Sequence, residues 1–319
     1  MAAQEPVAVI LAAGKGSRIY PLSASKPKPV LPVGNRPLLG HQLSLVRECG
    51  IRRVFIVIGH RGYEVVSALG DGSDYGVQIT YVEQSDTIGI AHALGTLESA
   101  VHSPFLLLLG DIYFVTDSLN QVVDDVVSGR VSATLVSRVE PDPEMVRRNF
   151  AIIADEEGRV RRVIEKPRHA KTQLKGCGIY MFDLAIFDAI RRTPRTAMRD
   201  EYEITDSIQI LIDDGHEVLH RPVVVEDYNL TAPEDLLAIN LLDLRRRGLP
   251  SLVGPGAHVA EGAVLHNCVV GANATIAHPI TMRDCLVFPG AVVDAQGPLD
   301  RVIVVDGATT IPCQRPSWA

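Results

Sequence analysis

Residues 11–33 read LAAGKGSRIYPLSASKPKPVLPV, and this stretch decides how the rest of the chain is interpreted. An apolar run directly before it predicts a short buried strand. Gly14 and Gly16 allow the backbone to approach an anion closely and to point its N–H groups toward it. Arg18 and Lys28 add two cations, and the prolines of the loop restrict its conformations before anything binds. The stretch therefore predicts a rigid polyphosphate-binding loop after a first β-strand.

The loop contains neither the Walker A pattern nor the G-x-G-x-x-G of dinucleotide-binding folds, which argues against a dinucleotide-dependent oxidoreductase. It resembles the signature of the sugar-1-phosphate nucleotidylyltransferases, L-A-x-G-x-G-x-R-x-x-P-L followed shortly by P-K-P. The matching residues are Leu11, Ala12, Gly14, Gly16, Arg18, Pro21, Leu22, Pro27, Lys28 and Pro29. An ordinary Gly/Pro-rich surface loop would match so many fixed positions only by a rare coincidence. The resemblance implies a Rossmann-like mixed α/β sheet and an enzyme that joins an NTP to a sugar-1-phosphate.

Composition limits the other possibilities. The chain has 319 residues, enough for one large domain or two, and 46% hydrophobic residues, as in ordinary globular proteins. Its net charge of −7 gives no electrostatic reason to expect a nucleic-acid partner. The five cysteines have no metal-ligand spacing, which favours reduced thiols, and no apolar run is long enough to span a bilayer. We therefore expect a cytoplasmic enzyme with no membrane or nucleic-acid partner.

The first half of the chain alternates predicted strands and helices. Strands are expected at 7–11, 53–58, 77–83 and 105–109, and helices at 37–50, 62–69 and 89–100. This alternation predicts a parallel α/β sheet, and such sheets bind ligands at the carboxyl ends of their strands. The second half adds strands at 131–137, 150–155, 160–164, 176–182 and 218–225, and helices at 184–192, 203–214 and 233–247. Residues 1–247 are the predicted catalytic domain.

A different pattern begins near residue 252. Apolar residues recur at six-residue steps, with one five-residue slip at Val270, and small residues lie between them. This period predicts a hexapeptide-repeat left-handed β-helix over 251–319 rather than irregular surface strands, and an oligomerisation domain that makes the protein a homo-oligomer. Its histidines could serve an acyltransferase, but the repeats are too few for a deep acyl-CoA cleft. We expect these histidines, His258, His266 and His278, on the exterior.

A second stretch resembles the base-reading segment of the same family. Residues 81–94 read YVEQSDTIGIAHAL, where the Gln84 amide can donate and accept hydrogen bonds on a base edge. Without the resemblance, a solvated strand end would be the simpler interpretation of Gln84. The nucleotide-binding residues that the resemblance implies are Leu11, Ala12, Ala13, Gly14, Gly16, Ser17, Arg18, Gln84 and Gly89.

Two acidic stretches resemble the family's Mg²⁺ ligands. Asp111 ends a buried strand in LLGDIYF and is the first expected ligand, although a turn or N-cap aspartate is a competing interpretation. The second stretch, EDYNLTAPEDL at 226–236, departs from the family's D-[IV]-[GN]-T-P-x-D-L. Counting back from Pro233 selects Asn229 as the second ligand, whereas residue type selects Asp227. Asn229 ranks slightly ahead, and both stay open.

The sugar-phosphate site follows from two further matches. Glu165, Lys166 and the following proline match the family's E-K-P, so Lys166 would hold the sugar phosphate and Glu165 the sugar hydroxyls. The family usually has glycine where this chain has Ala151, and the extra methyl either changes the choice of sugar or is tolerated. The implied sugar-phosphate residues are Gly110, Ala151, Glu165, Lys166 and Gly178.

The resemblance implies an in-line attack of a sugar-1-phosphate oxygen on the α-phosphorus of an NTP. The nucleophile is already an anion, so positioning and charge neutralisation replace a general base. Arg18, Lys28 and Asp111 are the expected catalytic residues, with Lys15 and Lys26 auxiliary. Gln84 favours dTTP or UTP with glucose-1-phosphate. The alternatives are GTP with mannose-1-phosphate and a non-catalytic regulatory relative of the same fold.

Overall fold

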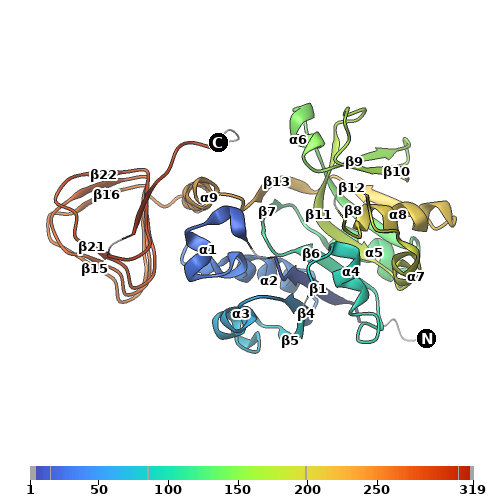
Figure 1. Ribbon diagram of the computed structural model, residues 1–319, viewed down its shortest axis with the longest axis horizontal. Helices are drawn as coiled ribbons and strands as arrows, with labels where there is room; N and C mark the ends of the chain where they lie inside the picture. Colours follow the sequence, from blue (N-terminus) through green and yellow to red (C-terminus); the bar gives the residue numbers. More distant parts are fainter. Residues whose placement is uncertain (1–4, 15, 85, 198–199, 308, 317–319) are drawn as a thin grey trace. The chain divides into compact units, whose positions relative to one another are not determined.

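The computed structural model describes residues 5–14, 16–84, 86–197, 200–307 and 309–316. The chain forms two compact units, which can be followed by colour in Figure 1. The first unit joins Met1–Lys15 to Gln42–Asp227, and the second joins Gly16–His41 to Tyr228–Ala319. The expected division into a catalytic domain ending at 247 and an oligomerisation domain starting at 251 concerns function and stays a prediction.

A nine-stranded mixed sheet forms the centre of the first unit. Its strands are β1 (Val7–Ala12), β4 (Arg53–Ile58), β5 (Gln78–Glu83), β6 (Phe105–Leu109), β8 (Ala133–Val139), β9 (Phe150–Ala154), β10 (Val160–Glu165), β11 (Leu174–Phe182) and β12 (Val218–Arg221). The main path is β10-β9-β11-β6-β1-β4-β5, and β8 pairs with β11 and β12. The strands β5, β4, β1 and β6 are parallel, whereas β11 is antiparallel to β6.

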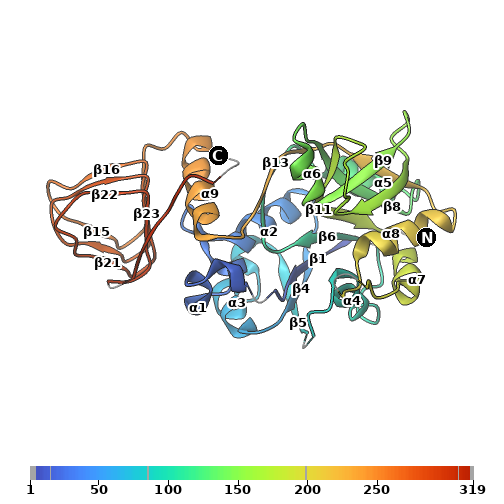
Figure 2. The ribbon, with the colours of Figure 1, turned by 45° about the horizontal axis from the view of Figure 1, so that its top comes forward.

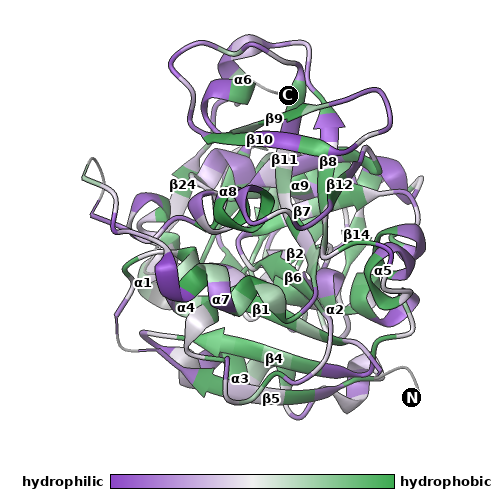
Figure 3. Cartoon of the chain, turned by 90° about the vertical axis from the view of Figure 1, so that its right-hand side faces the viewer, coloured by the Kyte–Doolittle hydropathy of each residue, from purple (hydrophilic) through white to green (hydrophobic). Residues whose placement is uncertain are grey.

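The parallel strands confirm the pattern expected from the sequence. β4 and β6 have the predicted bounds, and the first four residues of β6 are fully buried. Strands covered on both faces are apolar along most of their length, as the hydropathy colouring of β4 shows (Figure 3). Burial of these side chains provides most of the driving force for assembling the sheet.

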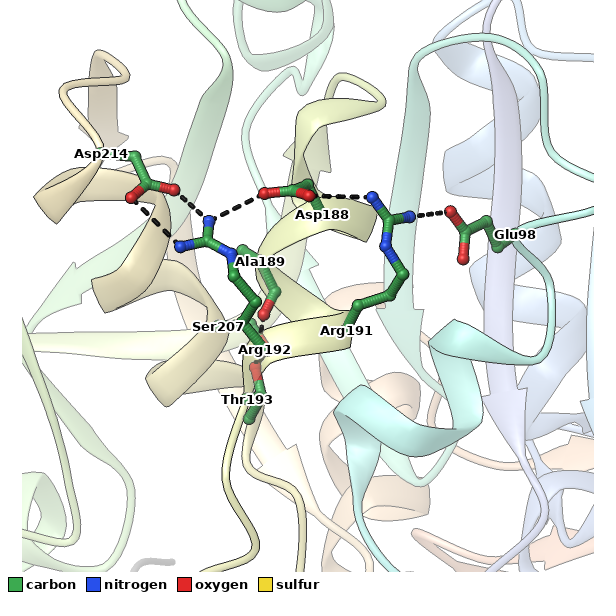
Figure 4. A network of polar contacts seen from close by, with 8 residues as sticks. All are labelled: Glu98, Asp188, Ala189, Arg191, Arg192, Thr193, Ser207 and Asp214. Atoms are coloured by element: carbon green, nitrogen blue, oxygen red, sulfur yellow. Dashed lines mark hydrogen bonds and ion pairs between the residues drawn. The ribbon is translucent and has the colours of Figure 1, made fainter.

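Short helices surround the sheet of the first unit. They are α3 (Gly62–Leu69), the 3-10 helix η3 (Ser73–Tyr75), α4 (Ile90–Gly95), α5 (Asn120–Val127), α6 (Pro143–Arg147), α7 (Ala185–Arg192) and α8 (Ile204–Asp213). Two arginines at the end of α7 connect it to its neighbours (Figure 4). Arg191 pairs with Glu98 and Asp188, and Arg192 pairs with Asp188 and Asp214. These pairs lie on the surface.

Two regions differ from the expected pattern. The single strand expected at 218–225 is two strands, β12 and β13 (Val224–Asn229), because Pro222 has no N–H for a continuous ladder. β13 pairs with β7 (Ile112–Thr116), a strand that the sequence pattern did not predict. This pairing brings the end of β13 into the same small sheet as the residues that follow Asp111.

The second unit begins with short elements from the signature loop. These are the 3-10 helices η1 (Ser17–Ile19) and η2 (Lys28–Val30), α1 (Leu22–Ser25) and the paired strands β2 (Pro32–Val33) and β3 (Arg36–Pro37). We refer to β2, β3 and the turn between them as the 32–37 hairpin. Helix α2 (Leu38–Glu48) follows and crosses the division between the units, and α9 (Pro233–Arg246) belongs to the second unit. None of the helices in the described ranges is long and apolar enough to cross a membrane.

The C-terminal strands form three parallel sheets. They are β14 (Leu252–Val253), β15 (His258–Val259), β16 (Val264–His266), β17 (Val269–Val270), β18 (Thr275–Ile276), β19 (Thr281–Arg283), β20 (Leu286–Val287), β21 (Val292–Val293), β22 (Leu299–Asp300) and β23 (Val302–Val304). Leu252 pairs with Val269 and Val269 with Leu286, so one turn of chain takes 17 residues. The same spacing relates His258, Thr275 and Val292. A final strand, β24 (Thr310–Pro312), is antiparallel to β23.

Left-handed backbone corners stack between these turns. Asn267, Asp284 and Arg301 have φ angles of 55°, 49° and 53° and lie 17 residues apart. Asn267 Nδ2 donates to Asp284 Oδ1 at 2.6 Å, and Arg301 Nη1 lies 3.5 Å from Asp284 Oδ2. A column of polar side chains therefore connects successive corners, which offsets the cost of the left-handed backbone at non-glycine residues.

Candidate active site

The carboxyl ends of four parallel strands form one edge of the first unit's sheet (Figure 2). Ala12 of β1 pairs with Ile58 of β4, and Ile58 pairs with Glu83 of β5. On the other side of β1, Leu11 pairs with Leu109 of β6. Because these strands are parallel, the residues that follow them gather at one edge. The expected site residues at this edge are Leu11, Ala12, Ala13, Gln84, Gly110 and Asp111.

A tight turn carries Gly110 and Asp111 from β6 into β7. The Gly110 N–H donates to the carbonyl oxygen of Leu11 at 2.9 Å. A Cβ on Gly110 would lie 2.7 Å from that same oxygen, so a larger residue would push the two strands apart. Asp111 itself is half-buried at the end of β6. The turn therefore places Gly110 and the carboxylate of Asp111 at the carboxyl edge of the sheet, next to β1.

Gln42 holds this turn and was not among the expected site residues. It is fully buried in α2, and its Nε2 donates to the carbonyl oxygens of Leu109 and Ile112, each at 2.8 Å. These two carbonyls flank Gly110 and Asp111 on both sides. One feature of the sequence could have identified Gln42. It lies four residues after Leu38, on the apolar face of the helix, and a polar residue buried on such a face needs hydrogen-bond partners.

Gln84 is buried directly after β5. Its backbone N–H donates to the Ile58 carbonyl at 2.8 Å, which continues the pairing of β5 with β4. Its side-chain Nε2 donates to the Asp86 carbonyl at 2.6 Å and lies 3.2 Å from His92 Nδ1. The His92 ring stacks on Tyr202 with 6.1 Å between centroids. The NH₂ group of Gln84 is thus bonded within the protein, which orients its carbonyl oxygen.

Gly89 has a structural requirement of its own. Its φ is +119°, and a Cβ would lie 2.3 Å from the carbonyl oxygen of Tyr202. The residues on both sides of Gly89 bond to the same tyrosine: Tyr202 N–H donates to Ile88 at 2.8 Å, and Ala91 N–H donates to Tyr202 at 3.1 Å. Glycine is therefore needed here for backbone packing, and its expected role at the nucleotide stays a prediction.

The antiparallel strands of the first unit carry the expected sugar-phosphate residues. Ala151 of β9 is buried and pairs with Ile164 of β10, next to Glu165. Lys166 follows with φ +40°, a left-handed conformation that is uncommon outside glycine, and its N–H donates to the Asn149 carbonyl at 2.8 Å. Its Nζ lies 4.0 Å from Glu165 Oε1, and its side chain is half-exposed. The backbone therefore turns sharply at Lys166 and leaves the ammonium accessible.

Gly178 marks an irregularity in β11. The register between β11 and β8 shifts between Gly176 and Tyr180, and Gly178 has a φ of +74°. A Cβ on Gly178 would lie 2.8 Å from Cδ1 of Ile112. Only glycine can adopt this conformation against the start of β7 without strain.

The two candidates for the second metal ligand have different surroundings. Asp227 is buried, and both its carboxylate oxygens bond to the ammonium of Lys175, at 2.7 and 2.9 Å. Burial raises the pKa of Asp227, and the Lys175 cation partly opposes that rise. Asn229 is exposed at the end of β13. The carboxylate of Asp227 is therefore engaged inside the protein, whereas Asn229 is exposed.

The cationic loop lies in the second unit. Lys28 is only 7% exposed, and Gly16 leaves room for it: a Cβ on Gly16, whose φ is +63°, would lie 3.0 Å from Lys28 Cγ. Gly16 also precedes η1, in which Ser17 and Arg18 are exposed. Lys15 lies outside the described residues. The structure therefore combines one buried and one exposed cation in this loop.

The 32–37 hairpin follows Lys28 and is held by side chains of α9. Asn240 is fully buried: its Nδ2 donates to the Pro32 and Leu236 carbonyls, and its Oδ1 accepts from the Gly34 N–H, each at 2.9 Å. Asn35 Nδ2 donates to the Val270 carbonyl at 2.9 Å. Like Gln42, Asn240 is a positioning residue that sequence reasoning missed.

The expected residues thus fall into three groups. The sheet edge of the first unit joins Leu11, Ala12, Ala13, Gln84, Gly110 and Asp111, with Gly89 at the start of α4 and the exposed Gly14 beyond β1. The antiparallel strands carry Ala151, Glu165, Lys166 and Gly178. The second unit carries Gly16, Ser17, Arg18, Lys28 and Asn229. Among the described residues, no three histidine, cysteine or acidic side chains cluster as a ready-made metal site.

Comparisons with known proteins agree with this architecture. Residues 7–224 match the family model described as nucleotidyl transferase. The low-salt glycan biosynthesis nucleotidyltransferase Agl11 of Haloferax volcanii is 37% identical over 246 residues, covering 76% of this chain and 67% of the relative. A glucose-1-phosphate thymidylyltransferase of Streptomyces griseus is 34% identical over 308 residues, covering 88% and 83%.

A solved structure supports the same relationship. The crystal structure from Bacillus anthracis, assigned to a glucose-1-phosphate thymidylyltransferase and in complex with a sucrose, has 30% sequence identity to this chain. It covers 74% of this chain and 94% of its own, with a TM-score of 0.65.

A mixed sheet with a glycine-rich segment after β1 and polar residues at its carboxyl edge is the Rossmann-like α/β fold of nucleotidyltransferases. The family model matches well over half of the residues, and the chain belongs to the nucleotidyl transferase family. The names of its relatives confirm the enzyme class expected from residues 11–33, the sugar-1-phosphate nucleotidylyltransferases.

Proposed function

We propose that this chain transfers a nucleotidyl group from an NTP to a hexose-1-phosphate, which yields an NDP-sugar and pyrophosphate. The observation that carries the proposal is the carboxyl edge of the parallel strands. There the backbone after β1, the oriented amide of Gln84 after β5 and the turn with Gly110 and Asp111 after β6 lie at the same edge of four neighbouring parallel strands. This arrangement supports a site that binds a base, close backbone phosphates and a metal ion at once.

The cationic residues have distinct proposed roles. Arg18 neutralises the departing pyrophosphate, and Lys28 withdraws charge from the α-phosphate during the attack. Lys166 holds the sugar phosphate, whose oxygen is the nucleophile. None of these steps needs a proton acceptor, since the nucleophile is already ionised. The catalysis is therefore electrostatic preorganisation together with orientation of the two substrates.

Gln84 supports a preference among nucleobases. Its NH₂ group is bonded to the Asp86 carbonyl and lies beside His92, so the side chain offers its Oε1 to a ligand. A carbonyl oxygen accepts from a ring N–H, which thymine, uracil and guanine carry and adenine and cytosine lack. We favour dTTP or UTP with glucose-1-phosphate. GTP with mannose-1-phosphate is the alternative that the same hydrogen bond permits.

The donor set is compatible with Mg²⁺. This ion prefers oxygen ligands and is often held by one or two protein groups plus substrate phosphates. Asp111 supplies a carboxylate, and the exposed Asn229 supplies a neutral amide oxygen, whereas both oxygens of Asp227 are bonded to Lys175. We therefore propose Asp111 and Asn229 as the ligands. When bound, Mg²⁺ would neutralise charge on the NTP phosphates.

The C-terminal strands have a separate proposed role. Their three parallel sheets and 17-residue turns are consistent with a left-handed β-helix built from hexapeptide repeats with one short step per turn. His258 and His266 are exposed and His278 is partly so, as expected for an exterior position. We propose that these coils join subunits into a homo-oligomer, and the cytoplasmic location stays a prediction.

One matrix experiment tests the proposed reaction. ATP, CTP, GTP, UTP and dTTP are each incubated with glucose-, mannose-, galactose- and N-acetylglucosamine-1-phosphate and Mg²⁺, and pyrophosphate release is measured. Rapid release with dTTP or UTP and glucose-1-phosphate is the expected result, and release with GTP and mannose-1-phosphate would select the alternative. No release with any pair would favour the non-catalytic regulatory relative and overturn the proposal.

A further inference from the structure

The two places where the chain departs from its family's pattern lie in one cluster. Lys175 of β11 is the direct cross-strand partner of Ala151 in β9. The Lys175 ammonium bonds to both oxygens of Asp227 in β13, at 2.7 and 2.9 Å. Residues directly opposite each other in an antiparallel pair extend to the same face of the sheet. The extra methyl of Ala151 and the unusual Asp227 are therefore connected through a single lysine.

This ion pair is unusually well buried. The side chains of Lys175 and Asp227 are each 1% exposed. Arg138, the partner of Lys175 in β8, lies 3.6 Å from Asp227 and 3.1 Å from Glu140, which balances the two positive charges. Desolvation cancels much of the attraction in buried ion pairs, so stability alone is a weak reason for one. Buried ion pairs are better known for fixing the relative position of the elements that carry them.

The location of the pair indicates what it could position. Asp227 lies in β13, which pairs with β7, the strand that follows the turn of Gly110 and Asp111. On the other side, Lys175 fixes β11 beside Ala151, which is next to the β10 residues that lead to Glu165 and Lys166. The ion pair thus connects the strand of the proposed metal ligand to the strands of the proposed sugar site.

We propose that Lys175 and Asp227 are positioning residues that adapt the sugar-phosphate site of this chain to its own sugar. The pair fixes β11 beside Ala151 of β9, and the partner strand of β9, β10, leads to Glu165 and Lys166. This inference rests on the proposed function, because it assigns a sugar-phosphate to that site. It adds that sugar binding, and not nucleotide binding, depends on the buried pair.

Three substitutions separate the charges of the pair. Lys175→Met leaves the buried Asp227 carboxylate with Arg138 at 3.6 Å as its remaining cation. Asp227→Asn keeps the shape but removes one charge, and the double change Lys175→Met/Asp227→Leu removes both charges. Each is expected to raise the KM for the sugar-1-phosphate by about 10-fold, less than the ~10²-fold that a misplacement of about 1 Å at a site can cost. The KM for the NTP is expected to stay unchanged. Lys175→Arg, which keeps the ion pair, is expected to restore the sugar KM.

The chain provides a matched control. Asp125 in α5 is fully buried and bonds to Arg221 in β12 at 2.7 and 3.0 Å, and neither element carries a proposed site residue. The double change Asp125→Leu/Arg221→Met removes this ion pair, in which Arg221 is 27% exposed, and also the contact of Asp125 with Arg130, elsewhere in the same unit. It is expected to shift the melting temperature without changing either KM.

Equilibrium binding provides a readout that does not depend on turnover. Affinity for the NDP-sugar product found in the matrix experiment is measured by calorimetry without Mg²⁺ and with it. The inference predicts weaker NDP-sugar binding in the Lys175 and Asp227 variants and unchanged binding of the NTP. Sugar KM and NDP-sugar affinity equal to those of the control variant would overturn it and leave the proposed function standing. A wild-type chain that turns over no substrate pair would overturn both.

Discussion

Two buried amides, one in each unit, hold turns of the chain: Gln42 holds the turn with Asp111, and Asn240 holds the 32–37 hairpin, which follows Lys28 in the sequence. Gln42 donates through Nε2 to the carbonyls that flank Asp111, and its Oε1, though buried, has no partner among the described residues. Asn240 uses both ends of its amide, donating to Pro32 and Leu236 and accepting from Gly34. The first amide is thus partly satisfied and the second fully satisfied.

The difference reflects how each turn is supported. The turn with Asp111 connects β6 and β7, two five-residue strands that already hold it in place, so Gln42 adds to an existing framework. The 32–37 hairpin has strands of only two residues. Its position must come from side chains outside it, and Asn240 supplies these bonds. A turn between two five-residue strands therefore tolerates an imperfect support, whereas a hairpin of two-residue strands depends on a complete one.

The largest effect is expected from the cations of the loop. Lys28→Ala and Arg18→Ala should each lower turnover by at least ~10²-fold, the scale for losing a preorganised electrostatic contact. Initial rates of pyrophosphate release at saturating substrates measure this. Lys26→Ala, which removes a neighbouring cation with only an auxiliary role, is the matched control. Near-normal turnover of either variant, or an equal loss in the control, would contradict the proposed roles.

The sheet-edge half of the site could be predicted from the sequence. β4 and β6 are apolar on both faces, so their pattern marks them as central parallel strands with the correct bounds. The topology of parallel strands then places whatever follows them at one edge. Hydrophobic patterning and topology together are therefore enough to locate Asp111 and Gln84 at the sheet edge, although their chemical roles stay proposals.

The supports of the site could not be predicted in the same way. Gln42, Asn240 and Lys175 are polar residues whose partners are distant in sequence, and a helical or strand period says nothing about such partners. Asn240 bonds to residues more than 200 positions away. Likewise, the period of 218–225 indicates one strand, whereas β12 ends directly before Pro222 and β13 begins at Val224. Tertiary hydrogen bonds are the information that local patterns lack.

Substitution of Gln42 and of Asn240 tests whether the two turns depend on their amides to different degrees, with the free energy of unfolding as the measure. Asn240→Leu removes the side-chain partners of the buried Gly34 N–H and Pro32 carbonyl and should lower the free energy of unfolding by about 3 kcal/mol. Gln42→Met loses two bonds but also removes the unpartnered Oε1, so about 1 kcal/mol is expected. Urea denaturation followed by circular dichroism measures both. Equal losses, or a larger loss for Gln42→Met, would show that the hairpin does not depend on its amide.

The hairpin is also expected to respond to pH. His41 Nε2 lies 3.0 Å from the Val33 carbonyl oxygen, to which it donates. Burial lowers the pKa of His41 below 6.5, as do Arg36 and Arg247, whereas the hydrogen bond to Val33 and the charge of Asp243 oppose this lowering. The unfolded chain therefore binds a proton that the folded chain resists. Stability should be fully present above pH 6.5 and should fall below it, by about 1.4 kcal/mol for each unit of pKa difference.

Denaturation at pH 7.5 and pH 5.5 compares the wild type with His41→Gln. The glutamine variant should lose less stability between these two pH values than the wild type does. His258→Gln, at an exposed histidine of the C-terminal strands, is the control and should follow the wild-type curve. If the stability of His41→Gln fell as steeply with pH as that of the wild type, His41 would not be the cause of the pH dependence.

The smallest effect on stability is expected from the exposed ion pairs at the end of α7. Arg191 contacts Glu98 and Asp188 at the end of α7 (Figure 4), but the three side chains are between 41% and 58% exposed. Water screens such pairs, so Arg191→Ala should cost at most about 1 kcal/mol, and added salt should reduce the difference further. Urea denaturation at low and high salt measures it against Asn240→Leu. A loss of stability as large as that of Asn240→Leu would mean that surface ion pairs stabilise this fold as strongly as buried amides do. We expect the opposite, because breaking the bonds of a buried polar group costs more than breaking an ion pair that water already screens.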